Sequence, residues 1–148
     1  MKTRIFVPIA ALLITSLHAA TPDQEKTFVA AYKTALVAND EKVLASFLST
    51  DGATAQLIGF FKSMQMLEPG STVVSIELIT PDAAELAKLT KPLKGPDGRS
   101  YKLPLKPVRE LVLKAETKTD SSSSTSTSTT GVAEKDGKLV IPVPVPAQ

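Results

Sequence analysis

Residues 108–141 read VRELVLKAETKTDSSSSTSTSTTGVAEKDGKLVI, and this stretch decides the fold class. Apolar and polar residues alternate from 108 to 117, which places Leu111 and Leu113 on one face of a strand. Near its other end, Asp136-Gly137 lies between two segments that suit a strand, and Asp-Gly is typical of a tight hairpin turn. The stretch therefore predicts antiparallel strands in the second half of the chain.

Between these strands lies the segment Ser121–Thr130, in which every residue is serine or threonine. Such a composition is typical of a disordered linker or a glycan-rich stalk. However, the β-branched residues Thr125, Thr127 and Thr129 alternate, so they would share one face of a strand. We favour the strand, because it would join 108–117 to the final hairpin in one continuous meander.

The tail after the hairpin has a proline at every second position, in the segment 141–146 (IPVPVP). In a strand, the three missing N–H donors would all fall on one edge. This pattern predicts an edge strand that pairs on one side and is blunted on the other. A polyproline II tail is the alternative.

The first half of the chain has helical spacing. Thr21-Pro22-Asp23-Gln24 is typical of a helix start with a capping box, and apolar residues then recur at helical intervals over 21–39, 40–48 and 53–67. A strand is predicted around 74–78, and a short helix between Thr80 and Leu89. Helices followed by antiparallel strands predict an α+β fold, with N-terminal helices packed on a curved, mainly antiparallel sheet.

The first twenty residues have the pattern of a signal peptide. Lys2 and Arg4 precede an apolar run over 5–17, and Ala19-Ala20 offers small residues for cleavage. The run is shorter than the ~20 residues of a membrane-spanning helix. We therefore expect cleavage near Ala19/Ala20, export to the periplasm or the cell exterior, no membrane span after processing, and a single α+β domain over 21–148.

The composition excludes much of the usual chemistry. The chain has no cysteine or tryptophan, and its one histidine, His18, lies in the leader. The processed chain thus lacks the side chains most often used for acid–base, covalent and metal chemistry near neutral pH, and we expect no cofactor and no metal. Met64-Gln65-Met66 resembles thioether copper spacing, but without histidine or cysteine we interpret it as core packing.

The charge distribution gives one candidate interaction surface. Loss of Lys2 and Arg4 lowers the 17 basic residues to 15, equal to the 15 acidic ones, so we expect no nucleic-acid partner. The basic residues that remain gather over 88–106, where they could meet an anionic surface of the cell envelope. A solvated loop is the simpler interpretation, since their spacing forms no stripe. The candidate contacts are Lys91, Lys94, Arg99, Lys102 and Lys106.

The helical half resembles a known superfamily. Residues 32–40 (YKTALVAND), 43–48 (VLASFL) and 51–53 (DGA) are similar to the opening of NTF2-like proteins, the cystatin-like α+β roll. Residues 134–141 (EKDGKLVI) are similar to the hairpin that ends many exported members. The segment 95–107 also resembles a stretch shared by other small exported proteins.

This resemblance implies a pocket between the helices and the concave face of the sheet. The superfamily includes ketosteroid isomerases, polyketide cyclases and non-catalytic binding modules. Tyr32 matches the tyrosine that donates to an oxyanion in the isomerases, but their general-base aspartate falls near Gln56 here. We therefore expect an exported, non-catalytic ligand-binding or structural module whose partner is an unknown small molecule or envelope component. Tyr32 and Tyr101 are the candidate ligand-binding residues, although Tyr32 also fits as a simple core residue. An enzyme using tyrosine and carboxylate acid–base chemistry is the alternative.

Overall fold

The computed structural model describes residues 20–95 and 97–147 of the chain. The predicted signal peptide, apart from Ala20, lies outside the described residues, and so does His18. No helix within the described ranges is both long and apolar enough to span a membrane.

Within the described residues four helices form, each with a polar N-cap. Thr21 accepts a hydrogen bond from the Gln24 backbone while the Gln24 side chain accepts one from the Thr21 backbone, so the predicted capping box is confirmed. Such reciprocal bonds satisfy two of the donors that a helix start leaves unpaired. The helices are α1 (Pro22–Val37), α2 (Glu41–Ser46), α3 (Ala55–Met64) and α4 (Ala83–Thr90).

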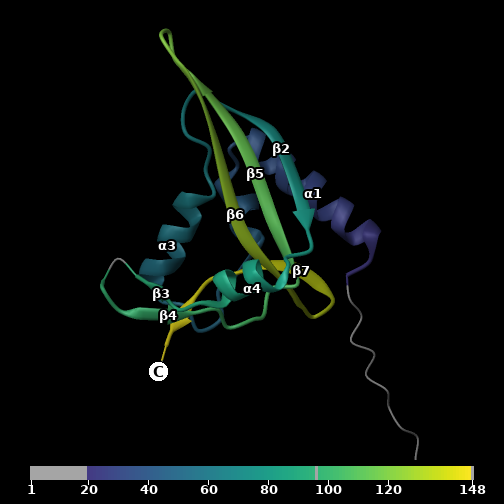
Figure 1. The fold of residues 1–148 in the computed structure, drawn as a ribbon, viewed down its shortest axis with the longest axis vertical. Coiled ribbons are helices and arrows are strands. Elements are labelled where there is room, and N and C mark those ends of the chain that lie inside the picture. Colours follow the sequence, from purple (N-terminus) through teal and green to yellow (C-terminus); the bar gives the residue numbers. More distant parts are fainter. Residues whose placement is uncertain (1–19, 96, 148) are drawn as a thin grey trace, which may run out of the picture.

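In the part of the chain that the structure describes, eight strands form two sheets, and the α+β prediction is confirmed (Figure 1). The larger sheet has the order β1-β7-β6-β5-β2 and is antiparallel except for the β1–β7 pair. Its strands are β1 (Leu48–Ser49), β2 (Ser71–Ile79), β5 (Arg109–Lys118), β6 (Ser123–Lys135) and β7 (Lys138–Pro142). The smaller sheet contains β3 (Leu93–Lys94), β4 (Ser100–Lys102) and β8 (Val145–Pro146).

The serine–threonine segment is a strand, as predicted, and the linker interpretation is wrong. β6 pairs with β5 without interruption from Arg109↔Val132 to Lys118↔Ser123. Every residue from 121 to 129 is exposed, and the two strands extend beyond the rest of the fold as a long hairpin (Figure 1). At its other end, β6 turns into β7 through Asp136 and Gly137, which both have positive φ, as a tight hairpin turn requires.

The tail differs from the predicted edge strand. The N–H groups of Ile141 and Val143 do point to one side, where they donate to the carbonyls of Phe47 and Ser49 at 2.8 and 2.9 Å. However, Ile141 and Pro142 belong to β7, which lies between β1 and β6, and Pro142 and Pro144 are buried rather than exposed at an edge. Only the end of the tail, β8, is an edge strand, because it pairs with β4 alone in the smaller sheet. The pairing of β7 with Leu48 and Ser49 makes these two residues strand β1, so α2 ends at Ser46, before the predicted helix end.

A hydrophobic core lies between the helices and the larger sheet. Phe28 and Tyr32 of α1 meet the Phe47 ring edge-on, at centroid distances of 5.2 Å. Leu36 and Leu44 are almost completely buried beside them, at 1% exposure each. The larger sheet and the residue that follows β7 contribute further buried residues to the same cluster: Ile76, Leu111, Val132, Leu139, Ile141 and Val143.

Candidate functional site

A small cavity of about 110 Å³ lies between the helices and the face of the larger sheet that they cover. It is partly open to solvent, because Met64, Ser128 and Thr129 line it and are exposed. α1 contributes Tyr32, and α3 and the turn after it contribute Phe61 and Gln65. The sheet contributes Leu111 and Leu113 from β5 and Ser128–Thr130 from β6.

Gln65 is the unusual residue of this cavity. Its side chain is buried, with 9% exposure, and neither Oε1 nor Nε2 has a hydrogen-bond partner in the part of the chain that the structure describes. A buried polar group left unpaired costs about 1–3 kcal/mol. Gln65 is also the C-cap of α3, where its backbone N–H donates to Phe61, so the helix end holds it in place. The site thus presents a fixed amide with an unused donor and an unused acceptor.

Tyr32 lies beside this amide at the back of the cavity. Its ring is stacked on Phe28 at a centroid distance of 6.1 Å, and its side chain is 5% exposed. Burial raises the pKa of the Tyr32 hydroxyl, and its polar contact with the neighbouring Gln65 side chain lowers the pKa, although the two groups do not meet the geometry of a hydrogen bond. The hydroxyl is therefore protonated at neutral pH and can donate as well as accept. Tyr32 is thus both a core residue and part of the cavity wall.

The cavity wall contains no aspartate or glutamate among the described residues. Gln56, at the position where the isomerases would carry their base, is exposed on α3 and does not line the cavity. Acid–base chemistry of the isomerase type needs a carboxylate within reach of the substrate proton. The arrangement can bind a polar group, but it offers no such base.

Tyr101 lies elsewhere, in β4 of the smaller sheet. Its hydroxyl donates to Asp97 Oδ2 at 2.6 Å, and this bond lowers the pKa of Asp97 and raises the pKa of Tyr101. The ring is 3% exposed and covers Gly95. The structure therefore does not bring the two candidate tyrosines together, and Tyr101 holds the turn between β3 and β4.

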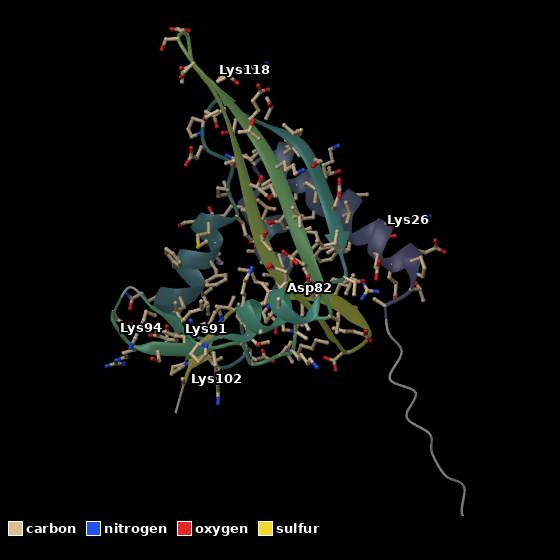
Figure 2. The ribbon with its side chains drawn as sticks, in the orientation of Figure 1. Lys26, Asp82, Lys91, Lys94, Lys102 and Lys118 are labelled. Atoms are coloured by element: carbon tan, nitrogen blue, oxygen red, sulfur yellow. The ribbon has the colours of Figure 1, made fainter. Side chains whose placement is uncertain are left out.

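The five basic candidates are all exposed, but they do not form one cluster. Lys94 pairs in register with Ser100, so Lys94 and Lys102 share a face of the smaller sheet. Figure 2 shows Lys91 at the same end of the molecule. Arg99 lies 3.8 Å from the Asp97 carboxylate, and Lys106 is on the segment between β4 and β5.

Sequence reasoning missed Gln65, because it placed the whole Met64-Gln65-Met66 segment in the core. Met64 is instead 63% exposed, so its predicted burial is wrong, and Met66 is half-buried. At the end of α3 the Gln65 side chain is buried, whereas Met64 lies at the rim of the cavity and is mostly exposed. One signal was present: a glutamine between apolar residues at the end of a helix whose inward face is otherwise apolar.

The fold and the cavity together define an α+β protein in which N-terminal helices cover a mixed sheet and enclose a small apolar site with one polar side. Comparison of the chain with protein-family models, curated proteins and solved structures gave no match.

Proposed function

We propose that this chain is an exported, non-catalytic binding module of the NTF2-like type, which takes a small chemical group into the cavity beside Gln65. One observation carries the proposal: the buried Gln65 amide has no hydrogen-bond partner among the described residues. If this position served only for packing, an apolar side chain there would make the protein more stable, because no buried donor or acceptor would then be left without a hydrogen bond. The helices-on-sheet arrangement and the position of Tyr32 support the NTF2-like type.

The cavity limits the chemistry of what enters it. Its walls are mostly apolar, and its volume of about 110 Å³ is below that of cavities of ~150 Å³ which admit benzene. The amide of Gln65 can donate and accept at once, and the Tyr32 hydroxyl adds a second polar contact. We therefore propose a compact apolar group that carries one amide, carboxyl or hydroxyl. The rest of a longer ligand would lie outside the cavity.

The variant Gln65→Leu tests this proposal. Because leucine has a similar size and needs no hydrogen bonds, the free energy of unfolding of the variant should be about 1 kcal/mol higher than that of the wild type. It should also bind isobutyramide about tenfold more weakly, while xenon, which is purely apolar, should bind at least as well as before. Urea denaturation gives the stability, and amide chemical shifts in NMR titrations give the two affinities.

Gln56→Leu is the matched control, because Gln56 is an exposed glutamine of the same helix and does not line the cavity. It should leave both affinities unchanged. If the wild type binds neither probe near Tyr32, or if Gln65→Leu binds isobutyramide as well as the wild type does, the cavity is not a site for polar ligands and the proposal fails.

A second candidate function is contact with an anionic envelope surface. It is favoured by the position of Lys91, Lys94 and Lys102, which lie at one end of the molecule in Figure 2 and take part in no ion pair among the described residues. Each lysine near an anionic membrane surface contributes about 1 kcal/mol to binding. The wild type should then bind phosphatidylglycerol vesicles at low salt and release them as salt is added.

Changing these three lysines to glutamine should weaken vesicle binding at least tenfold in a sedimentation assay. The matched control changes three exposed lysines elsewhere, Lys26, Lys33 and Lys118, two of which are labelled far from this end in Figure 2. Equal losses in the two triple variants would show a nonspecific charge effect, and absence of binding at low salt would exclude the function.

A further inference from the structure

β6 has an open edge along most of its length. It pairs with β5 over residues 123–132, but with β7 on its other side only over 133–135. Within the described residues, the edge from Ser123 to Gly131 has no strand partner. Open edges of this kind are usually blunted by charge or proline, and Ser121–Thr130 has neither.

The hydrogen-bond pattern shows which backbone groups face outward at this edge. Val108 N–H donates to the Val132 carbonyl, and Thr119 N–H donates to that of Ser122, so even-numbered residues of β6 direct their backbone groups toward β5. Since the direction alternates along a strand, odd-numbered residues direct theirs outward. Thr125, Thr127 and Thr129 therefore offer three N–H donors and three carbonyl acceptors to a further strand.

The cavity lies directly beside this edge. Ser128, Thr129 and Thr130 of β6 form one wall, and Phe61 and Gln65 of α3 and its C-cap form the wall across from it. Figure 1 shows α3 on the side of β6 away from β5. A chain added to β6 would run along this open edge, and every second side chain would point toward the covered face of the sheet. One such side chain would reach the cavity.

We propose that an extended, uncharged segment of a partner protein adds to β6 as a further strand and places one amide-bearing side chain in the cavity beside Gln65. This inference rests on the proposed function, since it names the ligand as a side chain. Main-chain hydrogen bonds to Thr125–Thr129 supply affinity, and the cavity supplies specificity, as in other cases of strand addition. Glutamine fits best, because its methylene groups match the apolar walls and its amide complements that of Gln65.

Charge and polarity decide between this partner and a second copy of the chain. The edge is uncharged over Ser121–Thr130, so a charged segment would bury its charge without a partner there. A second β6 is also uncharged, and it can pair with the first about a two-fold axis at Thr127. However, it would bring only serine and threonine to the cavity, and it would leave the apolar walls of Phe61 and Leu113 unfilled.

The test uses a synthetic acetylated and amidated heptapeptide of alternating serine and threonine with a central glutamine. Matched peptides carry leucine or aspartate at the centre. In NMR titrations of the wild type, the glutamine peptide should shift the amide signals of Thr125, Thr127 and Thr129 and slow their hydrogen exchange. It should bind about tenfold more tightly than the leucine peptide, and the aspartate peptide should bind more weakly still.

Two variants separate the edge from the cavity. Thr127→Pro removes one outward N–H and leaves the β5 pairing intact, so it should fold, bind isobutyramide as the wild type does, and bind every peptide at least tenfold more weakly. Thr127→Val keeps the N–H and should bind like the wild type. Gln65→Leu should keep strand addition but prefer the leucine peptide over the glutamine peptide.

The inference fails if no peptide shifts the three threonine amides at millimolar concentration, or if Thr127→Pro binds as well as Thr127→Val. It also fails if sedimentation shows a wild-type dimer that Thr127→Pro abolishes, because a second copy then occupies the edge. Isobutyramide binding that persists in any of these cases leaves the proposed cavity function intact. If the wild type does not bind isobutyramide, the proposed cavity function is contradicted, whatever the peptide results are.

Discussion

Leu36→Ala is expected to lower the free energy of unfolding by about 3 kcal/mol, within the range of 2–5 kcal/mol typical of buried leucines. Leu36 is 1% exposed and lies on the face of α1 that meets the sheet. The truncation removes contacts from several sides at once, and the close-packed surroundings relax only partly into the space. A loss of this size is a large fraction of the total stability of a domain of this length.

The neighbouring residue is the matched control. Val37 follows Leu36 on the same helix but is 63% exposed, so Val37→Ala should change the free energy of unfolding by no more than about 0.5 kcal/mol. Urea denaturation followed by circular dichroism measures both, with an unchanged slope as the sign that the unfolded state is unaffected. Similar losses in the two variants would contradict the assignment of this face of α1 to the core.

Gly95→Ala is expected to lower the free energy of unfolding by about 1–3 kcal/mol, the usual effect of an overpacked position. A Cβ atom at Gly95 would overlap Cε2 of Tyr101 and would lie 2.9 Å from Oδ1 of Asp97. The Tyr101 ring is buried and its hydroxyl donates a hydrogen bond to Asp97, so the ring cannot move aside without losing that hydrogen bond. The damage should therefore concentrate in the turn between β3 and β4.

Gly59→Ala provides the contrast within one residue type. Gly59 lies inside α3, and a Cβ atom there would meet nothing within 4 Å. Because alanine restricts the unfolded chain more than glycine does, this variant should gain about 0.5–1 kcal/mol. Thermal or urea denaturation gives the sign of the stability change in each variant. Faster hydrogen exchange at Ser100–Lys102 in Gly95→Ala would show that its destabilisation is at the turn between β3 and β4. A stable Gly95→Ala variant with normal exchange would refute the predicted contact.

Features that depend on neighbouring residues could be predicted from the sequence. The capping box joins Thr21 to Gln24, which are only three positions apart, and the Asp136-Gly137 turn needs only two residues with positive φ. The threonine alternation predicted that β6 is a strand, because one face of a strand repeats every second residue. Tyr32 was also placed correctly on the inward stripe of α1, where it is buried.

Features that depend on distant partners could not be predicted. Leu48 belongs to the helical pattern of 40–48, but the Phe47 and Ser49 carbonyls accept hydrogen bonds from the tail about ninety residues later in the sequence. That contact converts the end of the expected helix into β1 and places Ile141 and Pro142 inside the larger sheet. Likewise, the Met64-Gln65-Met66 pattern does not indicate that Gln65 faces inward and Met64 outward, since that depends on where α3 ends.

By itself, the sequence determined the α+β class, the helix starts, the β-hairpin and the strand nature of the serine–threonine segment. These follow from local hydrogen bonds and side-chain periodicity, which act over a few residues. Only the tertiary structure decided that β7 lies between β1 and β6 while the end of the tail joins the smaller sheet, that Gln65 is left unpaired in a cavity, and that β6 keeps an open edge beside it. Each of these depends on which distant segment occupies the neighbouring position, and backbone groups left without a neighbour become apparent only when the whole sheet is assembled.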